Sequence, residues 1–308
     1  MLAPLTNGPH EVLIRIGVPA RPRPRAGGRA RTRRLVLLVA LVAAVRPAAA
    51  QTHPGAPDST GHSRGLHVTR REWAVLGGTV AATALLAPMD ETVQRMMRQP
   101  DLQRRAGLRR DASILAFVGG PGPFVAGAAL YAIGRGIDAP GVAALGVHLT
   151  EGVLLAASIN ALGKGIAGRA LPDSVPHDDA GQFSFGRGFH DNNGDFVSFP
   201  SGHTAAAFAT AAVLTAEAER WRPGNRWVAP VAYGGAVVVG AARLYQNVHW
   251  VSDLPLAALI GTWSGLAVVH RAHAGGSSRL ERWLLGTTVT ASHGGAALRW
   301  SSGESDHR

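Results

Sequence analysis

Six long apolar stretches constrain the fold of this 308-residue chain more than any other feature of its sequence. Each is rich in Ala, Val and Leu and is long for a strand, so each predicts a helix. The stretches are 73–88, 112–134, 142–163, 204–218, 227–245 and 250–270. Short connections favour antiparallel neighbours in a bundle. The sequence therefore predicts an all-α fold, a six-helix bundle.

The positive charge is concentrated at the front of the chain. The formal net charge is +11, but residues 1–50 hold nine arginines and one acid, Glu11. The remainder is near neutral, so we expect no nucleic-acid partner.

The same front segment predicts an export signal. A basic run ends at Arg34, an apolar run covers 35–45, and three alanines end at Ala50. This order is typical of a signal peptide, which we place at 1–50 together with its basic preamble. A short uncleaved anchor is the alternative.

Three further regions follow the predicted signal. Residues 51–69 form a polar linker, 70–273 the helical domain, and 274–308 a C-terminal tail. Thr, Val and Ser spacing around a Gly-Gly pair within 284–300 predicts a small hairpin in the tail. The chain has no cysteine, so a disulfide framework and thiolate metal sites are excluded.

The sequence leaves two environments open for the bundle. Apolar helices favour a membrane, but His148, Glu151 and Asn160 are costly in lipid unless they face the bundle interior. A soluble bundle is the alternative. Residues 90–110 predict an amphipathic or surface helix, and the long loop 170–199 is of a length that usually carries function.

Lys164 is the single lysine in the chain, among thirty arginines. A compact ammonium suits a phosphate oxygen or a catalytic role. It lies near the predicted end of the third helix, in the segment from Lys164 to Pro172.

A second segment, Pro200-Ser201-Gly202-His203, opens the fourth predicted helix. A helix start offers backbone N–H groups and a positive dipole end to an anion. Gly202 permits close approach, and His203 would lie beside the anion as a proton donor. Simple N-capping by Ser201 is compatible with the same residues.

A third segment carries Arg243, His249 and Asp253 between the fifth and sixth predicted helices. Residues four apart share a helix face, so Asp253 can accept from one ring nitrogen of His249. The other nitrogen is then free to act as a nucleophile. The three segments fall at helix ends on one face of a bundle.

These three segments, in this order, resemble the signature of the phosphatidic acid phosphatase type 2 and vanadium haloperoxidase superfamily. That signature reads Lys-x6-Arg-Pro, then Pro-Ser-Gly-His, then Ser-Arg-x5-His-x3-Asp, and Ala242 replaces its last serine here. The likeness covers about 70–273 and implies the six-helix fold of that family. It also implies hydrolysis of a phosphate ester without a metal or another cofactor.

The resemblance assigns a role to each matching residue. It implies His249 as the nucleophile, Asp253 as its orienting carboxylate and His203 as general acid and base. It implies phosphate binding by the cations and by the fourth helix start. These phosphate-binding residues are Lys164, Arg169, Ser201, Gly202 and Arg243.

One position departs from the signature, because Leu171 stands where the family has its phosphate-binding arginine. Arg169 is two residues away and can replace that arginine only if the helix unwinds near Gly168. Arg187 in the long loop is another candidate.

The sequence thus predicts a cell-envelope phosphatase acting on phosphate monoesters or pyrophosphates, with a lipid phosphate as the favoured substrate. It would be membrane-associated or integral to the inner membrane. A soluble periplasmic acid phosphatase of broad specificity is the first alternative. A vanadate-dependent haloperoxidase and a non-catalytic envelope protein are the others.

Overall fold

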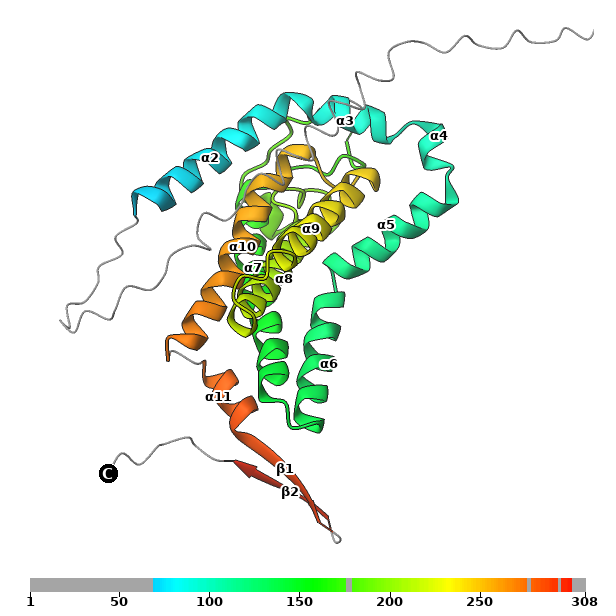
Figure 1. Ribbon diagram of the computed structural model, residues 1–308. Helices are drawn as coiled ribbons and strands as arrows, with labels where there is room; N and C mark the ends of the chain where they lie inside the picture. Colours follow the sequence, from blue (N-terminus) through cyan, green and yellow to red (C-terminus); the bar gives the residue numbers. More distant parts are fainter. Residues whose placement is uncertain (1–68, 176–178, 276–277, 293–294, 301–308) are drawn as a thin grey trace, which may run out of the picture. The chain divides into compact units, whose positions relative to one another are not determined.

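The computed structural model describes residues 69–175, 179–275, 278–292 and 295–300. The predicted signal peptide lies outside the described residues, and so does the linker except for Thr69. The described chain is helical (Figure 1). Its α-helices are α2 (Arg70–Leu86), α3 (Asp90–Met97), α4 (Pro100–Gln103), α5 (Ala106–Gly119), α6 (Gly122–Gly136), α7 (Pro140–Ala167), α8 (Gly202–Trp221), α9 (Val228–Tyr245), α10 (Leu254–His273) and α11 (Arg279–Gly286).

The all-α prediction is confirmed, and five of the six apolar stretches each form one long helix. The prediction of one helix over 112–134 is wrong, because α5 and α6 meet there at a bend of 56°. Pro121 explains the break, since it has no N–H for a helical hydrogen bond and it disfavours a helical residue before it. Residues 90–110, predicted as one amphipathic or surface helix, form the short helices α3 and α4 and the first residues of α5.

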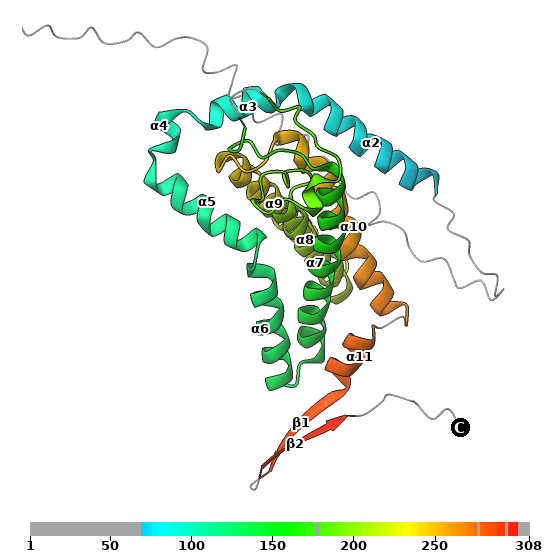
Figure 2. The ribbon, with the colours of Figure 1, turned by 180° about the vertical axis from the view of Figure 1, so that it is seen from behind.

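Helix α8 lies at the centre of the bundle, and most of the residues that it buries are alanines. One face packs on α7 and α10 through Ala205, Ala209 and Val213. The other packs on α9 through Ala207 and Phe208. Figures 1 and 2 show α8 among α7, α9 and α10 from two sides. Small residues let the backbones of these helices approach closely.

The contact between α8 and α10 is closest at Gly261 and Gly265. A Cβ at Gly261 would lie 2.1 Å from the carbonyl oxygen of Ala205, and one at Gly265 would lie 2.6 Å from that of Ala209. The two glycines are four residues apart and face one helix, which is the pattern of close helix pairs in membranes. This contact fixes the start of α10 against the start of α8.

Among the described residues, four helical segments are long and apolar enough to cross a membrane, or up to five if the bent pair α5 and α6 counts as one span. Many large apolar side chains on these helices point outward, including Trp73, Leu85 and Val231, which are 60–72% exposed. These features fit membrane association. The segments are Arg70–Met97, Pro140–Ala167, Val228–Tyr245 and Val251–His273.

The long loop between α7 and α8 folds back over the helix ends. A β-bridge joins Arg169 to Phe183, and the Ser198 amide donates to the Arg169 carbonyl at 2.9 Å. The Trp250 indole donates to the Ala170 carbonyl at 2.9 Å. Beyond α10, helix α11 leads into an antiparallel hairpin of β1 (Thr287–Ser292) and β2 (Gly295–Trp300), within the segment for which a hairpin was predicted.

Candidate active site

The predicted site residues come from four helix ends. Lys164 lies in the last turn of α7, His203 in the first turn of α8, and Arg243 in the last turn of α9. His249 follows α9, and Asp253 caps the start of α10. The Ser201 amide donates to the Asp253 carbonyl at 3.3 Å, which ties the start of α8 to the start of α10.

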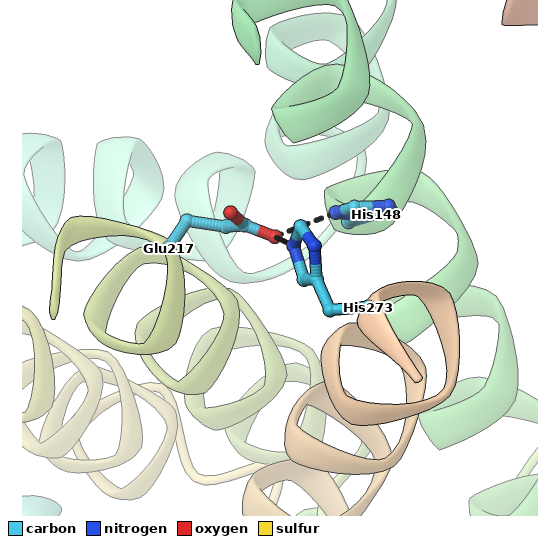
Figure 3. A group of neighbouring side chains, drawn as sticks. All are labelled: His148, Glu217 and His273. Carbon is cyan, nitrogen blue, oxygen red and sulfur yellow. Dashed lines mark hydrogen bonds and ion pairs between the residues drawn. The ribbon is translucent and has the colours of Figure 1, made fainter. Parts of the chain in front are cut away.

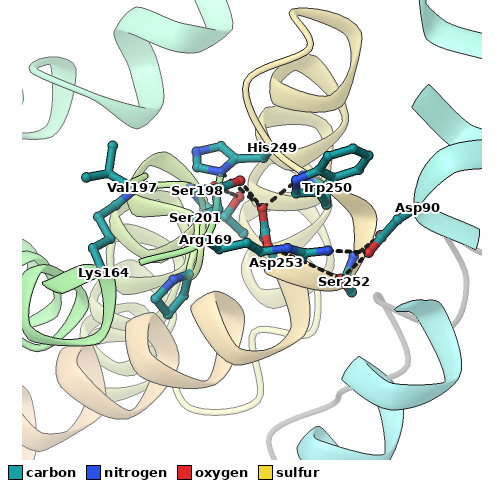
Figure 4. A network of polar contacts seen from close by, with 12 residues as sticks. Asp90, Lys164, Arg169, Val197, Ser198, Ser201, His249, Trp250, Ser252 and Asp253 are labelled. Carbon is teal, nitrogen blue, oxygen red and sulfur yellow. Dashed lines mark hydrogen bonds and ion pairs between the residues drawn. The ribbon is translucent and has the colours of Figure 1, made fainter. Parts of the chain in front are cut away.

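His249 and Asp253 form a buried pair. His249 Nδ1 lies 3.4 Å from Asp253 Oδ2, which is long for a hydrogen bond but within ion-pair range (Figure 4). The same Oδ2 accepts from Ser198 Oγ at 2.6 Å and from the Trp250 amide at 2.9 Å. Burial is the main cause that lowers the pKa of His249, so its imidazole is neutral near pH 7. A neutral ring held at Nδ1 can present Nε2 as a nucleophile.

His203 lies against the break between α5 and α6. A Cβ at Gly120 would stand 2.9 Å from the Ala116 carbonyl oxygen and 3.1 Å from His203 Nε2, so a side chain there would crowd the ring. Burial, followed by the positive charge of Arg243, lowers the pKa of His203 to about 4. The charge of Lys164 acts in the same direction, and so does His249 when it is protonated. The two histidines therefore share one cationic environment.

The two cations of the site have different partners. Lys164 Nζ donates to the Val197 carbonyl, and its side chain passes Gly202, where a Cβ would lie 3.7 Å from Lys164 Cε. Arg243 donates through Nη1 to Gln246. Its Nε is buried and has no acceptor within the described part of the chain. A buried donor of this kind suits an anionic ligand.

The start of α8 offers the amides of Gly202 and His203, the first two residues of the helix. Ser201 is the N-cap, and its Oγ accepts from the Thr204 amide at 3.5 Å and from Thr204 Oγ1 at 2.9 Å. Its own amide is already donated to Asp253, so the amide that a phosphate would meet first is that of Gly202. Helix N-termini with free amides bind anions.

The structure uses Arg169 differently from the sequence-based prediction. Helix α7 does end at Ala167, and Gly168 adopts the left-handed conformation, with a φ of 52°. Arg169 then points to two carboxylates, Asp253 Oδ1 at 2.6 Å and Asp90 Oδ2 at 2.7 Å. Its other N–H groups go to Ser252 Oγ and to the Ala180 carbonyl. All five N–H groups are therefore donated within the protein, which leaves none for a phosphate.

Asp90 and Ser252 complete a network that sequence reasoning missed. Asp90 is 1% exposed and accepts from the Ser252 amide at 2.9 Å and from Ser252 Oγ at 2.6 Å. The one available signal was the position of Asp90 at the end of an apolar stretch, since a carboxylate there needs a partner. Arg187, the other predicted candidate, stacks on the Phe196 ring with its Cζ 3.7 Å from the ring centroid.

A cavity of about 540 Å³ borders this network on the side of α2. Its polar lining includes Asp90, Glu91, Arg169 and Ser252, and its other walls are mainly residues of α2 and of the long loop. His203 and His249 do not line it. The Arg169 guanidinium therefore stands between this cavity and the His249–Asp253 pair.

Comparisons with known proteins agree with the motifs. The model of the PAP2 superfamily matches residues 145–275, which include Lys164, His203, Arg243, His249 and Asp253. A lipid A 1-phosphatase from Porphyromonas gingivalis is 38% identical over 87 residues, which is 28% of this chain and 19% of that protein. The chain thus spans about a fifth of that relative's length. No solved structure gives a significant match.

Proposed function

We propose, from the match of residues 145–275 to the PAP2 superfamily, that this chain is a membrane-associated lipid phosphatase that works through a phosphohistidine. The observation that carries the proposal is the convergence of two histidines and two cations from four helix ends. His203 lies in the field of Lys164, Arg243 and His249. Phosphoryl transfer needs mainly this positioning and positive charge.

In the first step His249 Nε2 attacks phosphorus and forms the N–P bond. The bond from phosphorus to the ester oxygen breaks, and His203 donates a proton to the leaving alkoxide. Asp253 keeps the His249 ring oriented and stabilises the positive charge that develops on it, from 3.4 Å away. An alcohol leaves, and the phosphoryl group stays on His249.

The negative charge that develops on the transferring oxygens needs cations and N–H donors to stabilise it. Lys164, Arg243 and the Gly202 amide would bind the phosphoryl oxygens. Arg169 acts as a positioning residue through Asp253, since its donors are all engaged. This distribution replaces the phosphate-binding role that the sequence predicted for Arg169.

In the second step water attacks the phosphohistidine. His203, now neutral, accepts a proton from the water as its oxygen bonds to phosphorus, and the N–P bond breaks. Inorganic phosphate leaves and both histidines return to their starting states. The proton that His203 gives to the alkoxide in the first step is regained from the water in the second.

A lipid phosphate is the substrate class that the surroundings of the site favour. The helices that carry the site present apolar side chains outward and fit membrane association. The relative from Porphyromonas gingivalis is named for dephosphorylation of a lipid. A phosphorylated lipid headgroup at the bilayer surface would reach the helix ends with its acyl chains still in the membrane.

The test is phosphate release by purified protein in detergent from a panel of lipid phosphates and soluble phosphate esters. We expect turnover of lipid phosphates, and loss of at least about 10³-fold in kcat for His249→Ala. Retention of more than a few per cent of activity in that variant contradicts the nucleophile assignment. A second measurement follows the intermediate directly. After acid-free quenching, ³²P from a labelled substrate should remain on the wild type and be absent from His249→Ala.

A further inference from the structure

A second polar cluster lies at the other end of the bundle. His148 comes from α7, Glu217 from the end of α8 and His273 from the last residue of α10 (Figure 3). His148 precedes Lys164 by 16 residues on one continuous helix, which separates the two by about 24 Å at 1.5 Å per residue. The cluster is therefore independent of the phosphatase chemistry.

The three side chains converge on one carboxylate oxygen. Glu217 Oε1 lies 2.7 Å from His148 Nδ1 and 2.9 Å from His273 Nε2. One ligand atom from each residue lies within 4.8 Å of the others. Ligand atoms of a tetrahedral zinc site are about 3.4 Å apart, since each is about 2.1 Å from the metal. Small side-chain adjustments would open the cluster to that spacing.

From this geometry we propose that His148, Glu217 and His273 bind a divalent transition-metal ion, with Zn²⁺ as the best fit. Two imidazoles and one carboxylate are a ligand set that zinc uses in proteins. The side chain of His273 is 28% exposed, whereas those of His148 and Glu217 are 1% and 4% exposed. The ion would enter past His273 and bind at the buried pair.

Glu281 on α11 strengthens the assignment, because it faces the other nitrogen of His148. His148 Nε2 lies 3.2 Å from Glu281 Oε1, and Glu281 is 5% exposed. A metal-bound histidine commonly donates its second N–H to a carboxylate, which fixes its tautomer and raises its basicity. Here that contact leaves the Nδ1 lone pair directed at the cluster.

Charge also favours a divalent cation. Two glutamates, Glu217 and Glu281, are buried around His148. Without a metal, both His148 and His273 must be protonated to neutralise the two carboxylates. With Zn²⁺ and neutral histidines the four side chains and the ion sum to zero charge, which lowers the cost of burial. The bound ion would also tie α11 to the bundle through Glu281 and His148.

The experiment measures zinc in the purified full chain after dialysis. We expect about one tightly bound Zn²⁺ per chain and visible ligand-field bands when Co²⁺ replaces it. Glu217→Gln and His273→Ala should each lose the bands and weaken binding at least about tenfold. His270→Ala is the matched control, since His270 is an exposed histidine on the same helix, and it should bind as the wild type does.

A second control, His249→Ala, distinguishes Zn²⁺ bound at this cluster from Zn²⁺ bound at the phosphatase site. This variant should keep its Zn²⁺. His273→Ala tests the site even if Glu217→Gln folds poorly, because His273 is partly exposed. Absence of bound Zn²⁺ and Co²⁺ from folded wild type overturns the proposal and leaves a hydrogen-bonded cluster. Binding that is unchanged in both ligand variants overturns it as well.

Discussion

At the scale of single residues, the two histidines of the site differ in their surroundings. His249 is buried beside a carboxylate, whereas His203 is surrounded by positive groups. The pKa of each is lowered, mainly by burial, so both rings are neutral in the empty site near pH 7. A bound phosphate brings negative charge next to Arg243 and Lys164, which raises the pKa of His203 again. Substrate binding would therefore convert His203 into the proton donor.

A general-acid role for His203 predicts that the loss of activity in a His203 variant depends on the leaving group of the ester. His203→Asn should lower kcat/KM for alkyl phosphates by about 10²–10⁴-fold, because an alkoxide must be protonated as it leaves. Aryl phosphates with acidic phenols should lose much less. The measurement is kcat/KM for a series of esters with both enzymes. Equal losses across the series would rule out a general-acid role for His203.

Arg169 carries a different prediction, because it holds two buried carboxylates. Arg169→Ala leaves Asp90 and Asp253 without their cation, and should lower the free energy of unfolding by about 3–5 kcal/mol. Arg187→Ala removes an exposed arginine that stacks on Phe196, and should change the free energy of unfolding by about 1 kcal/mol or less. Thermal melting in detergent compares the two. Wild-type melting of Arg169→Ala together with a raised KM would instead support a phosphate ligand.

At the scale of elements, the sequence predicted what depends on local pattern. Apolar length alone located the long helices, and the three motifs could be placed at their ends because helix starts and ends have local signals. The break at Pro121 had such a signal too, but the apolar run continued through it and concealed the change of direction.

What the sequence could not predict depends on long-range pairing. Asp90 is 79 residues from Arg169 and 162 from Ser252, and it begins a stretch that reads as a charged surface helix. Glu217 and His148 meet across 69 residues, each in a helix whose pattern gives no sign of the other. Only packing brings such groups together, so their partners become visible with the structure.

The packing of α10 on α8 gives a prediction at this scale. Gly261→Ala would place a Cβ 2.1 Å from the Ala205 carbonyl oxygen, a backbone atom that cannot rotate away. We expect the two helices to separate, at a cost of about 1–3 kcal/mol, and the site at their starts to lose activity. Gly235→Ala in α9 meets nothing within 4 Å and should be neutral or slightly stabilising. Similar melting temperatures and activities for both variants would contradict this account of the contact.

At the scale of the whole molecule, side-chain size is distributed as in membrane bundles. Small residues fill the contacts around α8, whereas large apolar side chains lie on outer faces. Helix α8 carries Glu217, Glu219 and Arg220 and is not among the candidate spans, but its neighbours enclose it. An apolar exterior of this kind is unfavourable in water, because large exposed patches promote association.

The molecule should therefore behave as an integral membrane protein when it is expressed in cells. Trp73, Leu85 and Val231 are 60–72% exposed, and the apolar window of the segment Arg70–Met97 is only 11% buried. Contacts of this kind with lipid tails do not depend on charge, so a high-pH wash that removes peripheral proteins should leave the chain in the membrane pellet. Detergent should release it together with its phosphatase activity. Release of active protein by the high-pH wash alone would favour the soluble periplasmic phosphatase, because charge-dependent contacts would then be all that held the molecule at the bilayer.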